Sequence, residues 1–246
     1  MKPLSKFLLG LGLSLCLIST AIASERYALV VGNGDYAFSP LKNPTNDAAD
    51  MAVALRQVGF KVRHLENATR RELRKEIHNF SNDLSKDDVG LFYYSGHGVQ
   101  SNNENFLITI GAEIQAEYMI EDEAVGVRTV LGAMEASGSR LNIVVLDACR
   151  DNPFRQTFRS TGRGLAIVHA PRGTLVAFST APGQVAADGK GRNSPYTKHL
   201  LAALATPNLA IEQVFKKVRV EVGRDTAGAQ VPWEESSLMG DFYFTG

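Results

Sequence analysis

Short apolar runs alternate with amphipathic stretches along this chain, a pattern typical of strands that alternate with helices. The runs that predict strands lie at residues 27–31, 60–65, 89–94, 106–110, 143–146 and 174–179, and a closing strand is expected at 241–245. Apolar residues at helical spacing predict helices between them, among them one over 125–136. The order predicts an α/β fold with a mainly parallel sheet of about six strands and helices on both faces.

Capping signals mark the ends of several predicted helices. Asn46 or Asp47 can cap a helix that Gly59 ends, and the run from Thr69 to Glu72 reads as a capping box. Ser194 is expected to cap a helix with Pro195 in its first turn. A last helix is predicted from apolar residues at helical spacing: Ile211, Val214, Phe215, Val218 and Val222.

The first 23 residues have the pattern of a secretory signal peptide. Two lysines precede a mostly apolar stretch over residues 7–22, and Ala21-Ile22-Ala23 is a small-residue cleavage signal. An uncleaved membrane anchor is the alternative, but the apolar stretch is short for a span of about 20 residues. We therefore expect residues 1–23 to be removed, residues 24–246 to form one domain, and the product to be periplasmic or secreted, without a membrane attachment.

The charge balance points to no polyanionic partner. Loss of the leader removes two lysines and no acidic residue, which leaves 24 basic against 26 acidic side chains. The densest basic run, residues 70–75, is interrupted by Glu72 on a predicted helix, whereas nucleic-acid binding needs a clustered basic face. No nucleic-acid partner is expected.

Cys149 is the only cysteine after the leader, because Cys16 lies within it. It follows an apolar strand in LNIVVLDAC, and His97 follows another in VGLFYYSGHG. The carboxyl ends of parallel strands meet at one edge of a sheet, so these residues share a crevice if their strands are neighbours. Taken alone, Cys149 is more often a buried structural cysteine and His97 a histidine without a functional role. Their joint placement at strand ends favours a functional pair.

A thiol and an imidazole together can cleave an amide bond. The imidazole takes the thiol proton and later protonates the leaving amine, while backbone N–H groups stabilise the oxyanion. We expect Gly98 and Cys149 to supply those N–H groups, and a backbone carbonyl to hold the other ring nitrogen of His97. The remaining histidines show no paired metal-ligand spacing.

Several stretches together resemble the caspase-like cysteine peptidases of clan CD, family C14, and specifically their bacterial metacaspase-like branch. They are YALVVGNGDY, LKNPTNDAADM, YYSGHG, VVLDACRDNPF, FSTAPGQVAADGKGRNSPYT and QVPWEESSLMGDFYF. The resemblance runs from about residue 26 to residue 246. It implies a caspase-like three-layer sandwich and a cysteine endopeptidase with a dyad of His97 and Cys149.

The resemblance also implies a substrate class. In metacaspases an acidic S1 pocket accepts Arg or Lys, and the matching positions here are Asp47, Ser95 and Asp147. Carboxylates hold a guanidinium well through paired hydrogen bonds. The expected partners are therefore proteins or peptides with a basic P1 residue. Asp47 has a second interpretation as a helix cap.

The chain departs from metacaspases after the nucleophile, where it continues Arg150-Asp151-Asn152 in place of His-Ser-Gly. Many metacaspases are activated by calcium; Glu121, Asp122 and Glu123 are acidic, but they match no known site, so no metal ligand is assigned and calcium activation is left open. Two other functions compete with the peptidase: a catalytically silent caspase-like domain that binds a partner in the cell envelope, and an amidase or transferase that uses the same thiol.

Overall fold

The computed structural model describes residues 24–149, 165–182, 184 and 186–245; the predicted leader lies outside them. Its strands are β1 (Arg26–Gly32), β2 (Lys61–Glu66), β3 (Val89–Ser101), β4 (Glu104–Leu107), β5 (Val125–Gly126), β6 (Leu141–Cys149), β7 (Thr174–Phe178) and β8 (Trp233–Ser236). Its helices are α1 (Pro44–Gln57), α2 (Arg70–Asp83), η1 (Glu117–Met119), α3 (Ile120–Glu123), α4 (Val127–Ala136), α5 (Pro195–Leu204) and α6 (Ile211–Asp225).

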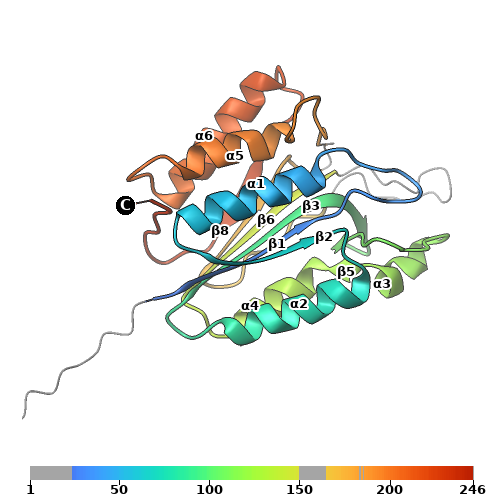
Figure 1. Cartoon of the computed structure of the whole chain (residues 1–246), viewed down its shortest axis with the longest axis horizontal. Coiled ribbons are helices and arrows are strands. Elements are labelled where there is room, and N and C mark those ends of the chain that lie inside the picture. The colour runs from blue at the N-terminus through green and yellow to red at the C-terminus, as the bar shows by residue number, and fades with distance from the viewer. Residues whose placement is uncertain (1–23, 150–164, 183, 185, 246) are drawn as a thin grey trace, which may run out of the picture.

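The main sheet has the strand order β2-β1-β3-β6-β7-β8. Its first five strands are parallel and β8 is antiparallel to β7. Helices α1, α5 and α6 cover one face, and α2 and α4 cover the other (Figure 1). The predicted α/β architecture, a mainly parallel sheet of about six strands between helices, is confirmed.

Each face of the sheet has its own apolar core, because successive residues of a strand point to opposite faces. In β1, Ala28 and Val30 pack under α1, α5 and α6, whereas Leu29 and Val31 pack against α2 and α4. Strands buried on both faces read as continuous apolar runs. For this reason the central strands were recognisable from sequence.

Two expected strands are longer than the apolar runs predicted. β3 continues through the SGHG sequence to Ser101, and its last part pairs antiparallel with β4. β6 continues through Asp147 to Cys149. The small and polar residues here remain in the hydrogen-bonded ladder, so His97 and Cys149 lie within strands and not in loops after them.

Two further predictions are wrong. Residues 241–245 are not a strand; Phe242 and Phe244 alternate because both are buried in the core beneath α6, and β8 lies earlier, at Trp233–Ser236. The cap of α1 is Asn43, and Asp47 lies in the first turn of the helix. The capping box at Thr69, the Ser194 cap and the end of α1 before Gly59 are confirmed.

Candidate active site

The register of the two central strands brings the predicted dyad together. β3 and β6 are parallel neighbours, and the backbone of His97 lies opposite that of Cys149. Two residues earlier on the same strands, Ser95 lies opposite Asp147. A Cβ on Gly98 would lie 3.1 Å from the Cβ of Ala148, so the glycine after His97 permits this close approach. The side chain of Cys149 is outside what the structure describes.

The imidazole of His97 has a defined tautomer. Its Nε2 lies 2.7 Å from the carbonyl oxygen of Ser39, which can only accept, so Nε2 carries the proton. Nδ1 is buried and has no hydrogen-bond partner within the described part of the chain. Burial lowers the pKa of His97, although the Ser39 carbonyl and the charge of Asp188 oppose this effect. The neutral ring therefore keeps a free lone pair on Nδ1, and the expected carbonyl partner is Ser39.

Two buried carboxylates lie beside the dyad. Asp47 on α1 is fully buried and Asp147 on β6 is 6% exposed. Ser95 donates from Oγ to Asp47 Oδ2 at 3.1 Å, and the backbone N–H of Ser194 donates to Asp47 Oδ1 at 3.0 Å. The structure thus unites Asp47, Ser95 and Asp147, and the alternative interpretation of Asp47 as a cap is wrong.

The two carboxylates are held by hydroxyl and amide donors. Ser194 donates from Oγ to Asp147 Oδ2, and Thr197 Oγ1 donates to the same oxygen at 2.7 Å. Among the described residues, no Lys, Arg or His side chain forms an ion pair with Asp47 or Asp147. Within the described ranges, each carboxylate is therefore buried without a cation in direct contact.

This arrangement perturbs both acids. Burial, together with the charge of Asp147, raises the pKa of Asp47 to about 8. Burial also raises the pKa of Asp147, against the hydrogen bonds from Ser194 and Thr197. Desolvation and like charge both disfavour the ionised form, so Asp47 keeps its proton up to a pH of about 8.

The connection between β7 and α5 closes this part of the site. We call residues 186–194 the pocket loop. Asp188 accepts from the backbone N–H of Lys42 at 2.8 Å and of Asn43 at 3.2 Å, and these residues precede α1. Arg192 forms a two-pronged ion pair with Asp50 on α1, with both N–O distances 2.8 Å. The pocket loop is thereby fastened to the first turns of α1.

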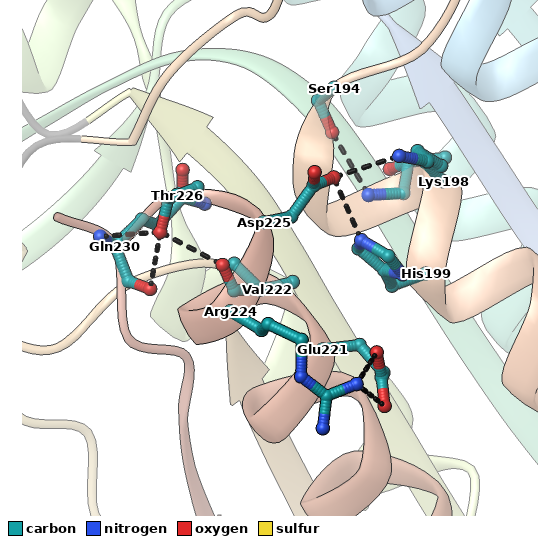
Figure 2. A network of polar contacts seen from close by, with 10 residues as sticks. Ser194, Lys198, His199, Glu221, Val222, Arg224, Asp225, Thr226 and Gln230 are labelled. Atoms are coloured by element: carbon teal, nitrogen blue, oxygen red, sulfur yellow. Dashed lines mark hydrogen bonds and ion pairs between the residues drawn. The ribbon is translucent and has the colours of Figure 1, made fainter. Parts of the chain in front are cut away.

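The loop is also fastened to the C-terminal end of α6. Gln230, 2% exposed, donates from Nε2 to the carbonyl of Ser179 at 2.8 Å and accepts from the N–H of Ala187 at 3.1 Å. Figure 2 shows Gln230 held in turn by Thr226 at the end of α6. In the same view Asp225 joins α6 to Lys198 and His199 of α5.

Sequence reasoning recognised Ser194 as a helix cap and missed its contacts with both carboxylates. It also missed Thr197, Asp188 and Gln230, whose roles depend on which strands and helices lie side by side. For Ser194, Thr197 and Asp188 the sequence signal was their clustering in FSTAPGQVAADGKGRNSPYT, a segment with few apolar residues, whereas Gln230 begins the separate stretch QVPWEESSLMGDFYF. Gly98 is placed next to His97 by β3, but its predicted role in an oxyanion hole depends on a substrate.

Within the described ranges, no group of three or more His, Cys, Asp or Glu side chains could hold a metal ion. Glu121, Asp122 and Glu123 lie on the short helix α3 and belong to no such group. Over the same ranges, no helix has the length and apolar character needed to cross a membrane.

Comparisons with known proteins identify the family of this chain. Two curated proteins match over 130 residues: human mucosa-associated lymphoid tissue lymphoma translocation protein 1, 34% identical, and its mouse homolog, 33% identical. The matches cover 52% of this chain, and the chain spans about 15% of the length of these relatives.

A solved structure, protein GSU0716 from Geobacter sulfurreducens, superposes with a TM-score of 0.64 over 90% of this chain and 98% of that one. At 16% identity this likeness shows the fold alone. The family model described as Caspase domain, of peptidase family C14, matches residues 25–243. This match spans nearly the whole described chain, and the protein therefore belongs to the caspase domain family of cysteine peptidases.

Proposed function

We propose that this protein is a metacaspase-like endopeptidase that cleaves after Arg or Lys through a dyad of His97 and Cys149. The observation that carries the proposal is the pair of buried carboxylates of Asp47 and Asp147, which form no ion pair with a described residue, beside the backbone positions of the dyad. A guanidinium or ammonium group would neutralise this pair. Family membership supports peptide-bond hydrolysis, and the acidic pocket supports the basic P1 residue.

The neutral imidazole suits the role of general base. Nδ1 takes the proton of the Cys149 thiol as the sulfur attacks the scissile carbonyl, and it then gives that proton to the leaving amine. Water next attacks the thioester and gives its proton to Nδ1. The acid product leaves as Nδ1 returns this proton to the sulfur, which restores the thiol. The Nε2–H bond to Ser39 stabilises the imidazolium during both steps. Backbone N–H groups of Gly98 and Cys149 would stabilise the oxyanion.

The pocket contributes binding energy at the P1 side chain. In the empty protein the raised pKa values of Asp47 and Asp147 leave them short of two full charges. Entry of a basic side chain replaces a proton by a fixed cation with several N–H donors. Binding of Arg or Lys is therefore coupled to proton release, and an acidic P1 residue is repelled.

The test is turnover of fluorogenic peptides that differ only at P1, with Arg, Lys or Asp, by the purified chain without residues 1–23. We expect cleavage of the Arg and Lys peptides, no cleavage of the Asp peptide, and loss of activity in Cys149→Ala. Parallel assays with calcium and with a chelator would show whether calcium activates. No turnover of any peptide would favour the silent binding domain in place of the peptidase.

We also propose that the chain is exported and that the peptidase works in the periplasm or outside the cell. The support is the leader pattern: two lysines, an apolar stretch and the Ala21-Ile22-Ala23 sequence.

A further inference from the structure

Tyr36 lies in the connection between β1 and α1 and contacts His97 through its ring and its hydroxyl. Its side chain is 3% exposed. Its ring packs against the imidazole at a centroid distance of 4.6 Å and an interplanar angle of 53°. The ring therefore covers one side of the imidazole and keeps water from it, in agreement with the lowered pKa of His97.

The hydroxyl of Tyr36 holds the backbone of the same residue. Its Oη accepts from the His97 backbone N–H at 3.0 Å and lies 3.0 Å from both the Ile108 carbonyl and the hydroxyl of Tyr94. The hydroxyl of Tyr94, whose single hydrogen the two acceptors share, lies 2.7 Å from the carbonyl oxygen of Ile108 and 2.9 Å from that of His97. The backbone of His97 is thus held by tyrosine hydroxyls at both its N–H and its C=O group.

These hydroxyls also explain the first glycine of SGHG. A Cβ on Gly96 would lie 2.6 Å from Tyr36 Oη and 2.7 Å from Tyr94 Oη, and Gly96 has a φ of +156°. Any larger residue would displace the hydroxyl pair. The glycine is therefore required so that the tyrosine hydroxyls can reach the chain at His97.

The same segment fixes the far side of the imidazole. Ser39 follows Tyr36 by three residues and accepts the Nε2 proton of His97 at 2.7 Å. Movement of Tyr36 would also move this carbonyl, because the two residues belong to one short connection. Without the Ser39 contact, nothing would keep the proton on Nε2 and the lone pair on Nδ1.

We propose that Tyr36 is a positioning residue for the candidate general base: its hydroxyl, ring face and connection to Ser39 hold His97 in the Nε2–H tautomer beside Cys149. This inference rests on the proposed peptidase function. Tyr36 acts through His97.

The test uses Tyr36→Phe, which keeps the ring and removes the acceptor, and Tyr36→Leu, which removes both. Tyr27→Phe, at the opposite end of β1, is the matched control for loss of a hydroxyl. For Tyr36→Phe we expect kcat on an Arg peptide to fall between about threefold and about tenfold with KM unchanged. For Tyr36→Leu we expect a larger fall, and the acid limb of kcat/KM moves to higher pH because water returns and the pKa of His97 rises.

A second readout does not depend on turnover. Nitrogen-15 NMR of the imidazole should show one protonated and one unprotonated ring nitrogen in the parent chain and in Tyr27→Phe, with tautomer exchange in both Tyr36 variants. Parental kcat and parental imidazole signals in Tyr36→Phe would overturn the inference, as would a change confined to KM. If the parent cleaves no peptide, the proposed function fails, and the NMR comparison alone decides the role of Tyr36.

Discussion

At the scale of single residues, the chemistry of the candidate site depends on two buried carboxylates. Asp47 and Asp147 are buried, and their hydrogen-bond donors in the described part of the chain are neutral. Charged groups without water or a counter-ion are costly, and the cost appears as raised pKa values. The basic P1 side chain of the proposed function would relieve this cost by neutralising the pair.

Replacement of Asp147 by Asn tests this view directly. Loss of one partner of a buried charge pair costs about 2 to 5 kcal/mol, so kcat/KM for an Arg peptide should fall by at least about 30-fold in Asp147→Asn. Asp241→Asn, an exposed position, serves as the control. If Asp147→Asn cleaves Arg peptides near the parental rate, the pocket assignment is wrong.

The stability of the empty protein should depend on pH through Asp47. Its pKa is about 8 when folded and starts from an ordinary value of 3.8, so between these values the folded chain binds the proton and the unfolded chain does not. The free energy of unfolding should therefore fall as pH rises from 4 to 8, by up to about 1.4 kcal/mol per pH unit for one proton.

Denaturant unfolding at several pH values measures this slope. Asp47→Asn should flatten it, whereas the exposed control Asp87→Asn should retain it; an unchanged slope in Asp47→Asn would contradict the assignment. With substrate present, KM for an Arg peptide should decrease as pH approaches 8, because binding then displaces fewer protons.

At the scale of elements, the pocket loop has no strand or helix of its own and is held by its neighbours. The first turns of α1 bind it through Asp50 and the backbone of Lys42 and Asn43, and the end of α6 binds it through Gln230. These anchors come from opposite ends of the sequence. The shape of the pocket therefore depends on α1 and α6 being fixed against the same face of the sheet.

Gln230→Ala should loosen the loop without touching the dyad. It leaves the Ser179 carbonyl and the Ala187 N–H without their partner, which costs about 1–3 kcal/mol of unfolding free energy. We expect KM for an Arg peptide to rise several-fold and kcat to change little. Steady-state kinetics beside Gln57→Ala, an exposed position on α1, would show the difference; an equal effect of both variants would exclude the role.

At the scale of the whole molecule, the parallel sheet places every candidate functional residue of the site near one edge. Crossovers between parallel strands bring β3 and β6 together although 52 positions separate His97 from Cys149. The chain enters β1, the first strand after the predicted leader, at the opposite end of the sheet.

The export proposal gives a measurable outcome. Expression of the full sequence in a bacterium with a secretory pathway should yield a product whose intact mass corresponds to residues 24–246, recovered in the periplasmic fraction or the medium. A change of Ala21 and Ala23 to large residues should retain the leader and shift the mass accordingly. A cytoplasmic product of full mass from the unaltered chain would contradict export.

The sequence by itself determined the elements and the dyad candidates, because periodicity, capping residues and glycine positions act locally. The apolar parts of the central strands were predicted, since burial on both faces leaves an unbroken apolar run, but the small and polar residues that continue β3 and β6 were not. The strand predicted at residues 241–245 is wrong because Phe242 and Phe244 alternate with polar residues owing to their burial under α6, and not because the segment pairs as a strand. Only the tertiary structure decided the register of His97 and Cys149, the turn of Asp47 towards Ser95, and the anchoring by Gln230 and Tyr36. Those features arise where segments distant in sequence meet, and no local pattern encodes which polar groups burial will force together.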